Sequence, residues 1–221
     1  MRVNLKKVNE DLIEKQLDNK KLTLFVKRVF DILVSFIVLL IIFIPSLLIA
    51  LAIKLDSKGP VFYKQERLGR GKVPFYIIKF RTMGVGADKN LDNLTVKNDP
   101  RITRVGGFLR KWKLDELPQF INVFKGDMSL VGPRPETPKL VKMYENYYDV
   151  IFKIRPGITD YASIEFRNES DYYNSIEDSE TIYLRDILPK KIDLKIKYLE
   201  NLSLKTDILI LLNTAKTIIT E

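Results

Sequence analysis

The stretch ILVSFIVLLIIFIPSLLIALAI, from Ile32 to Ile53, contains no charged residue and decides the fold of this chain. Its length matches what an α-helix needs to cross a hydrocarbon core of about 30 Å. No other stretch of the sequence is both as long and as apolar. We therefore expect this segment to bind the protein to a membrane, and hydropathy alone favours a single spanning helix.

The residues around and within this stretch favour a different path. Lys27 and Arg28 precede it and Lys54 follows it, so the positive-inside rule draws both ends to the cytoplasmic face. A single passage cannot satisfy that rule at both ends. Pro45 permits a sharp bend, and the hydroxyl of Ser46 can satisfy a backbone group freed by it. The flanks thus favour a re-entrant helix-break-helix with the break at Pro45 and Ser46, while hydropathy favours a spanning helix with a tolerated proline, and both paths stay open on the residues alone.

The composition limits the chemistry. The chain has 221 residues, a net charge of +9, no Cys and no His. Nucleophilic and acid–base work near neutral pH must then fall to Asp, Glu, Lys, Tyr, Ser or Thr. A metal site must use oxygen ligands, which indicates Mg²⁺ rather than zinc. The positive charge predicts an anionic partner, either lipid headgroups or a phosphorylated substrate. Nucleic acid ranks last, because no nucleic-acid-binding signature accompanies the basic residues.

Local patterns predict an α+β fold that is mostly helical, with amphipathic surface helices and one small β-hairpin. Three parts are expected: an amphipathic N-terminal extension, a re-entrant membrane helix and a cytosolic domain that is either catalytic or binding, over residues 1–24, 25–57 and 58–221. Within the last part we expect five elements. They are a hairpin (61–83), a polar loop (84–100), a helix bent at Pro118 (102–124), a Tyr-rich helix (139–154) and a docking or interfacial helix (208–219).

Asp115 and Glu116, within KLDELP, are the first candidate site. Neighbouring residues on a helix project about 100° apart, so one carboxylate can attack while the other binds a metal or handles a proton. Taken alone, such a pair usually belongs to a solvated helix face. Apolar neighbours on both sides, and Arg110 five residues earlier, favour a site here.

Further basic residues are candidates for phosphate binding. Arg134 lies between two prolines, and a guanidinium held in place suits bidentate phosphate recognition, although an ordinary rigid turn fits equally well. Lys79 and Arg81 share one face of the second hairpin strand, where a contact with the lipid surface is the simpler reading. Arg167 follows the RPGIT segment, which by itself reads as a helix stop and a loop.

In this order, the segments VFYKQERLGRG, IIKFRTM, NDPRITRVGGFLRKWKLDELPQFINVFKGDMSLVGPRPE and RPGIT resemble the bacterial sugar transferases, also called monotopic phosphoglycosyl transferases. The resemblance runs from about Lys27 to Asn168 and more weakly to the C-terminus. Its most specific block spans Asp99 to Glu136. The chain is similar to the small catalytic unit of the family, whose larger members carry extra membrane helices before it.

The resemblance implies a reaction. Such enzymes move a sugar 1-phosphate from a UDP-sugar to a polyprenyl phosphate such as undecaprenyl phosphate, release UMP, and so initiate the assembly of capsule, exopolysaccharide, O-antigen or glycoprotein glycans. By resemblance Asp115 is the nucleophile that forms a covalent phosphosugar intermediate, and Glu116 assists through the Mg²⁺ site and proton handling. The enzyme would lie at the cytoplasmic face of the bacterial inner membrane, held by a re-entrant helix among the membrane lipids.

The resemblance also assigns the basic candidates. Arg110, Arg134 and Arg167 match arginines expected near phosphates or the nucleotide, and Lys79 is a weaker match. A carboxylate that attacks an anionic diphosphate needs such cations to offset charge repulsion.

Two departures from the family pattern and one competing function stay open. The family commonly has Ser-Pro at the membrane break, where this chain has Ile44 before Pro45. Members often carry an Asp where this chain has Lys195, with Asp193 as a substitute nearby. The competing function is a non-catalytic membrane-surface scaffold of a polysaccharide assembly system. The sequence names neither the sugar nor the pathway, and it leaves a homo-oligomer open.

Overall fold

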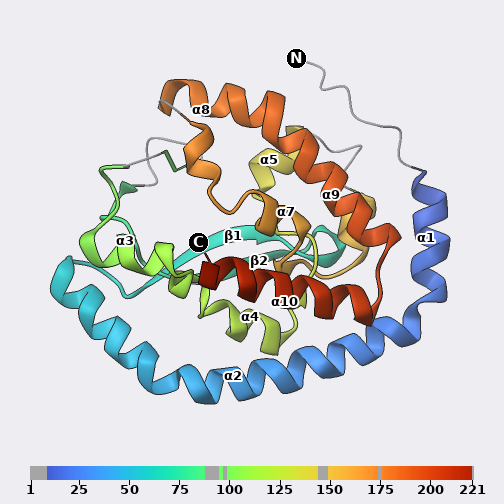
Figure 1. Cartoon of the computed structure of the whole chain (residues 1–221), viewed down its shortest axis with the longest axis horizontal. Helices are drawn as coiled ribbons and strands as arrows, with labels where there is room; N and C mark the ends of the chain where they lie inside the picture. Colours follow the sequence, from blue (N-terminus) through green and yellow to red (C-terminus); the bar gives the residue numbers. More distant parts are fainter. Residues whose placement is uncertain (1–8, 88–94, 97–98, 144–148, 174–175, 221) are drawn as a thin grey trace.

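The computed structural model describes residues 9–87, 95–96, 99–143, 149–173 and 176–220 (Figure 1). These residues form mostly helices, with one antiparallel and one parallel two-stranded sheet. The expected α+β, mostly helical class is therefore confirmed. The loop expected over 84–100 and the helix expected over 139–154 fall partly outside the described residues.

The chain begins its described part with two consecutive helices, α1 (Glu10–Asn19) and α2 (Lys21–Asp56). Asn9 caps α1, because its Oδ1 accepts a hydrogen bond of 3.2 Å from the backbone N–H of Leu12. Ile13 and Leu17 of α1 are buried in the same core as residues far along the chain. The amphipathic extension therefore packs on the body of the protein.

Helix α2 is continuous from Lys21 to Asp56, with Pro45 inside it. This corrects the expected helix-break-helix in one respect, since no interruption at Pro45 and Ser46 separates two helices. Figure 1 shows instead that α2 is curved, with the rest of the protein on its concave side. A proline inside a helix removes one hydrogen bond and favours bending.

The N-terminal part of α2 is bound to the body by buried polar contacts. The Lys27 ammonium pairs with the Asp207 carboxylate at 2.6 Å. The Arg28 guanidinium donates to the carbonyl of Val123 at 2.7 Å. The Asp31 carboxylate accepts a 3.0 Å bond from the N–H of Leu130. This arm of the helix is thus fixed by partners from three separate segments.

The C-terminal end of α2 is held just as firmly. The guanidinium of Arg81 donates to the carbonyls of Ser57, at 2.8 Å, and Lys58. The carboxylate of Asp56 accepts a 3.0 Å bond from the N–H of Val105. Arg81, read from the sequence as a lipid contact, instead satisfies carbonyls at a helix end.

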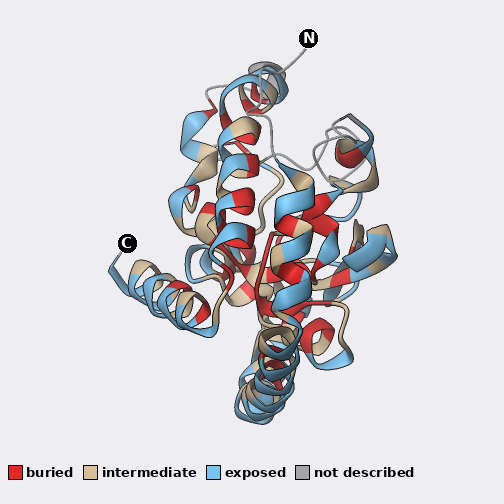
Figure 2. Cartoon of the chain, turned by 90° about the vertical axis from the view of Figure 1, so that its right-hand side faces the viewer, coloured by how far each residue is buried: buried red, intermediate tan, exposed pale blue. Residues whose placement is uncertain are grey.

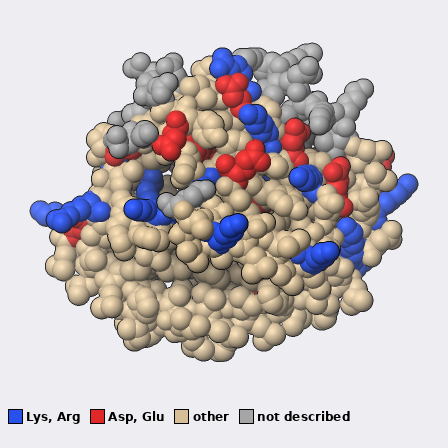
Figure 3. All heavy atoms as spheres, viewed as in Figure 1, with Lys and Arg blue, Asp and Glu red and all other residues tan. Residues whose placement is uncertain are grey.

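Between these anchors, the middle of α2 is exposed and apolar. Figure 2 shows the helix projecting from the body with its buried residues on the side that faces the protein. In Figure 3 the surface over this part carries no Lys, Arg, Asp or Glu. Among the described residues, α2 is the one helix long and apolar enough to cross a membrane. Between Ser35 and Lys54, its exposed large side chains are Phe36, Ile37, Leu40, Ile41, Phe43, Ile44, Leu47, Leu48 and Leu51.

The predicted hairpin is confirmed. Strand β1 (Phe62–Leu68) pairs antiparallel with β2 (Pro74–Phe80), and Phe62 lies opposite Phe80. The connection is the short turn η1 (Arg70–Lys72), in which Gly71 and Lys72 have φ angles of 67° and 59°. The hairpin thereby brings Lys79 close to the helical segment that carries Glu116.

The helix expected from Ile102 onward is divided into three pieces: α3 (Arg104–Lys111), the 3₁₀ turn η3 (Leu114–Glu116) and α4 (Gln119–Lys125). The interruption falls at Lys113, whose φ is 54°, and Pro118 is the cap that precedes α4. The expected bend at Pro118 is thus corrected to a break before Asp115. Gly106 lets α3 approach the segment that follows β2, since a Cβ there would lie 2.1 Å from the carbonyl oxygen of Thr82.

A second sheet was not predicted. Strand β3 (Ser129–Val131) pairs in parallel with β4 (Gly157–Thr159). A Cβ on Gly157 would lie 2.1 Å from the backbone nitrogen of Gly132, so the two strands require glycine where they meet. The pairing joins the two segments that carry the Arg134 and Arg155 motifs.

The remaining elements complete the body above α2 in Figure 1. Helix α9 (Leu188–Glu200) supplies the centre of the core with residues such as Leu188 and Leu199, both fully buried. Helix α10 (Leu204–Thr220) confirms the amphipathic helix expected near the C-terminus, with Ile210 buried and Leu212 exposed. The further helical elements are α5 (Pro138–Met143), η4 (Val150–Lys153), α7 (Tyr161–Glu165), η5 (Glu169–Tyr172), α8 (Ile176–Ile182) and η6 (Tyr183–Ile187).

Candidate active site

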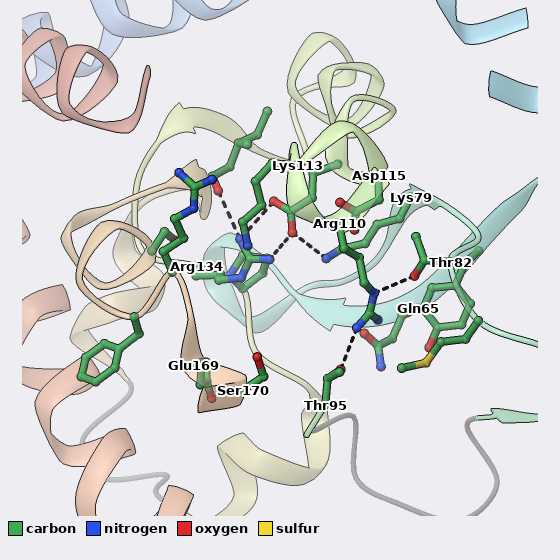
Figure 4. A pocket seen from close by; sticks show the side chains of 18 of the residues that line it. Gln65, Lys79, Thr82, Thr95, Arg110, Lys113, Asp115, Arg134, Glu169 and Ser170 are labelled. Carbon is green, nitrogen blue, oxygen red and sulfur yellow. Dashed lines mark hydrogen bonds and ion pairs between the residues drawn. The ribbon is translucent and has the colours of Figure 1, made fainter. Parts of the chain in front are cut away.

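A large cavity of about 1470 Å³ opens beside the hairpin and is lined by residues from β1, β2, η3, α7, α9 and α10. Figure 4 shows that basic and acidic side chains point into it from several of these elements. All six site residues predicted from the sequence line this cavity: Lys79, Arg110, Asp115, Glu116, Arg134 and Arg167. The fold therefore brings together residues that are far apart in the chain.

Asp115 lies in the turn η3, with 8% of its surface exposed. Its Oδ1 atom is buried and has no hydrogen-bond partner among the described residues. Burial raises the pKa of this carboxyl, the neighbouring charge of Glu116 raises it further, and Lys79, Lys113 and Arg110 oppose the shift. The carboxylate is thus surrounded by cations without being bound to one.

Glu116, the next residue, has the opposite surroundings. Its Oε1 accepts a 2.7 Å contact from the Lys79 ammonium and a hydrogen bond from Arg134, which also approaches Oε2 at 3.4 Å. Burial alone would raise the pKa of Glu116, but Arg134 and Lys79 outweigh it and hold the pKa well below its usual range. Glu116 is therefore an ionised anchor for two of the predicted cations.

Arg134 is fixed from several sides. Its backbone N–H donates to the Asp160 carboxylate at 3.1 Å, and its guanidinium donates to the carbonyl of Ile158 at 3.3 Å as well as to Glu116. The charge of Glu116 raises the pKa of Arg134 despite burial. Prolines on both sides add stiffness, as the sequence indicated.

Arg110 extends from α3 toward the hairpin. Its guanidinium donates to the hydroxyls of Thr82, at 2.8 Å, and Thr95, at 3.0 Å. Burial lowers the pKa of Arg110, and Asp115 partly restores it. Sequence reasoning missed both threonines, although Thr82 stands directly within the KFRTM segment.

Arg167 lies on the opposite wall. Its guanidinium donates to the carbonyl of Thr217 in α10 and, at 3.4 Å, to that of Lys111. These bonds connect the end of α7 to α10 and to α3, so Arg167 contributes to the wall rather than to the group around Glu116.

A second acidic group in the cavity was also missed. Glu136 pairs with the buried ammonium of Lys195 and lies 3.9 Å from Arg67. Lys195 thus balances a buried carboxylate, whereas Asp193, the candidate substitute for the family Asp, is exposed on the other face of α9. The signal was available in sequence, because GPRPE places a Glu two residues after Arg134.

The fit of Mg²⁺ can be judged from the carboxylates alone. Among the residues that the structure describes, no group of three acidic side chains is placed to hold a metal. Mg²⁺ commonly binds through one or two carboxylates together with substrate phosphates. The partnerless Oδ1 of Asp115, with Glu116 beside it, fits a cation that enters with a phosphorylated substrate.

The protein thus combines a cavity lined by several basic side chains with a helix long and apolar enough to cross a membrane. The model of the family described as bacterial sugar transferase matches residues 22–221, and the chain belongs to this family.

Curated relatives extend this finding. The chain is 38% identical to the UDP-N-acetylgalactosamine-undecaprenyl-phosphate N-acetylgalactosaminephosphotransferase of Aeromonas hydrophila, over 89% of this chain and 44% of the relative. It is 38% identical to the UDP-glucose:undecaprenyl-phosphate glucose-1-phosphate transferase of Escherichia coli (strain K12), over 85% of this chain and 39% of the relative. It is 37% identical to the UDP-glucose:undecaprenyl-phosphate glucose-1-phosphate transferase of Caulobacter vibrioides, over 88% of this chain and 70% of the relative. The chain thus spans less than half the length of the first two relatives.

Proposed function

We propose that this protein transfers a sugar 1-phosphate from a UDP-sugar to undecaprenyl phosphate through a covalent intermediate on Asp115, releasing UMP. The names of the relatives support the substrates, since they pair UDP-sugars or their sugar 1-phosphates with undecaprenyl phosphate. The observation that carries the proposal is the Oδ1 of Asp115, a buried acceptor without a partner in the described chain.

The first half of the reaction forms one bond and breaks one. A carboxylate oxygen of Asp115 attacks the phosphorus that bears the sugar, and the bridging oxygen leaves with UMP. A carboxylate that is already ionised needs no separate base for this step. Lys79, Lys113 and Arg110 favour the ionised form here.

The second half restores the enzyme. A phosphate oxygen of undecaprenyl phosphate attacks the same phosphorus and displaces the Asp115 carboxylate. The product is the undecaprenyl-diphosphate sugar. The leaving carboxylate returns to the cationic surroundings from which it attacked, so Asp115 regains its original state.

The cations supply most of the catalysis in this scheme. Glu116 holds Lys79 and Arg134 in place, and Arg110 is oriented by two hydroxyls, so these groups need little reorganisation to meet the diphosphate. Arg167 would neutralise charge from the far wall. Asp115 and Glu116 would hold Mg²⁺, which would neutralise charge on the diphosphate when bound. Glu116 would also assist proton handling.

The decisive experiment measures UMP release from a panel of UDP-sugars with undecaprenyl phosphate and Mg²⁺. We expect release with at least one sugar and its loss in Asp115→Asn, which preserves shape and removes the nucleophile. Full activity of that variant would overturn the assignment of Asp115. No release with any sugar would favour the non-catalytic scaffold instead.

We also propose that α2 enters the bilayer from the cytoplasmic face of the inner membrane and returns to it. Both ends of α2 are bound to one body, and α1 before it shares a core with α9 after it. Single cysteines at the exposed Lys15 and Glu200 test this, because the native chain has no Cys. Both should react with a membrane-impermeant thiol reagent only from the cytosolic side, and labelling of the two from opposite sides would restore the spanning helix.

A further inference from the structure

Lys113 has a backbone conformation that lysine rarely adopts. With φ at 54°, it lies in the left-handed region directly after α3. Its N–H donates to the carbonyl of Arg110 at 3.1 Å, and its own carbonyl accepts from Glu116 at 3.3 Å. Glycine is the usual residue at such a helix end, because it avoids the steric cost of a Cβ. Strain of this kind concentrates at functional sites.

The side chain of Lys113 lines the active-site cavity beside Asp115 (Figure 4). The ammonium has no hydrogen bond or ion pair with the part of the chain that the structure describes. Its charged neighbours are Glu116, Arg134, Asp115 and Lys79, in order of the strength of their electrostatic interaction with the ammonium. Because Glu116 is already paired with Lys79 and Arg134, Lys113 is a cation in surplus.

The second left-handed lysine shows that strain alone does not explain this arrangement. Lys72 has nearly the same φ, 59°, but lies in the hairpin turn outside the cavity and pairs with Asp149. Lys72 thus has an acidic partner on the surface, whereas Lys113 lies in the cavity among the charges of Glu116, Arg134 and Asp115. The two residues share a backbone conformation and differ in what their charge meets.

Lys113 also lies at the seam between the cavity and the apolar surface. The next residue, Leu114, packs against the cluster of Ile53 in the C-terminal arm of α2. The preceding turn of α3 exposes Trp112 by 42% and Phe108 by 59%. A ligand whose apolar tail lay on this surface would have its headgroup close to Lys113.

We propose that Lys113 binds the phosphate of the polyprenyl acceptor and guides it toward Asp115. The inference rests on the proposed function, since it assigns one residue to the second substrate of that reaction. An ammonium with no internal partner can donate to a phosphate without breaking an existing bond. The strained backbone is what directs this side chain into the cavity instead of along α3.

The test measures affinity for undecaprenyl phosphate in detergent without any donor, and then the KM for each substrate. Lys113→Asn removes the charge with a residue that tolerates the left-handed region, and Lys113→Gly relieves the strain as well. We expect both to weaken acceptor binding and raise the acceptor KM by about tenfold, as for the loss of one charge-assisted bond. Lys113→Arg should bind the acceptor nearly as well as the native chain.

Lys72→Asn is the matched control, and it should leave both substrates unaffected. Unchanged acceptor binding in Lys113→Asn would overturn the inference, as would a rise confined to the KM of the UDP-sugar. A merely structural role is tested by Lys113→Gly, whose Tm should equal or exceed that of the native chain. If the native chain itself releases no UMP while binding still depends on Lys113, the proposed transfer fails and the lipid-phosphate contact stands.

Discussion

Asp115 and Glu136 are two buried carboxyls in the same cavity, and they differ in their ion pairing and in the direction of their pKa shifts. Glu136 is paired with Lys195 and approached by Arg67, and these cations outweigh burial so that its pKa is lowered. Asp115 has cations near it but no bond to Oδ1, and its pKa is raised. The comparison separates a carboxylate that the fold has satisfied from one that is left available to a ligand.

The largest expected effect comes from Asp115→Asn. Transfer activity should fall by about a thousandfold or more, as for the loss of a nucleophile in other enzymes. The Tm should stay equal or rise, because the substitution removes a buried charge that is not fully compensated. UMP release and calorimetry check the two halves of this prediction. A large fall in Tm would show that Asp115 holds the fold together and would erase the contrast with Glu136.

Glu136→Gln should behave in the opposite sense. The substitution leaves Lys195 buried without its partner, and breaking one side of a buried ion pair costs about 3–5 kcal/mol in the free energy of unfolding. Denaturant unfolding at neutral pH checks it. The double variant with Lys195→Met should recover much of the loss, since it removes both charges. A loss that the double variant does not recover would mean that the pair itself is not the source.

The two carboxyls should also differ in the pH dependence of stability. The pKa of Glu136 is lowered from its ordinary value of 4.5, so its stabilising contribution is present above that pH and is lost as the pH falls through the folded pKa. The pKa of Asp115 is raised from 3.8, so its contribution is present below 3.8 and is lost as the pH rises through the folded pKa. The Tm gap between native chain and Glu136→Gln should therefore shrink in acid.

Measuring Tm against pH also tests the pKa shift of the Asp115 carboxyl. Any increase in Tm of Asp115→Asn over the native chain should appear as the pH rises above 3.8 and vanish below it. Tm profiles of the three chains from pH 3 to pH 7 in one buffer system give both trends. Parallel profiles would show that neither group is linked to unfolding.

The smallest expected effect is that of Mg²⁺ on the protein without substrate. If Asp115 is a ligand, a concentration ten times the Kd stabilises the native chain by about 1.4 kcal/mol, or roughly 3–5 °C in Tm. Asp115→Asn should lose this shift, and Glu136→Gln should keep it. Addition of EDTA should abolish UMP release and excess Mg²⁺ should restore it. An equal shift in all three chains would place the ion elsewhere.

The sequence predicted those features whose signal is local. The apolar run of α2, the alternation in the hairpin and the Asp115–Glu116 pair with Arg110 nearby each depend on residues close together in the chain. The distant Arg134 and Arg167 were assigned by the resemblance to the family. The strand pair β3 and β4 escaped prediction, because each strand has three residues and their partners are distant in sequence. The GPRPE motif could have drawn attention to Glu136, but its pairing with Lys195 from α9 depends on residues that are distant in sequence.

The break at Lys113 shows a different limit. Apolar residues continue at helical spacing on both sides of it, and no glycine marks the end of α3. Periodicity therefore predicted a helix where the chain makes a left-handed turn. That single torsion turns Asp115 and Glu116 into the cavity, so the feature hardest to read from the sequence is the one that positions the candidate nucleophile.

The curve of α2 between its two anchors has a consequence for the lipid. In the proposed orientation, the exposed arc determines how deeply the protein sinks, and Arg81 ties the end of that arc to the strand that carries Lys79. The height of Asp115 above the hydrocarbon is then a property of the protein rather than of the acceptor. The enzyme would recognise its lipid at the headgroup, and acceptors with shorter or longer tails would reach Asp115 at the same level.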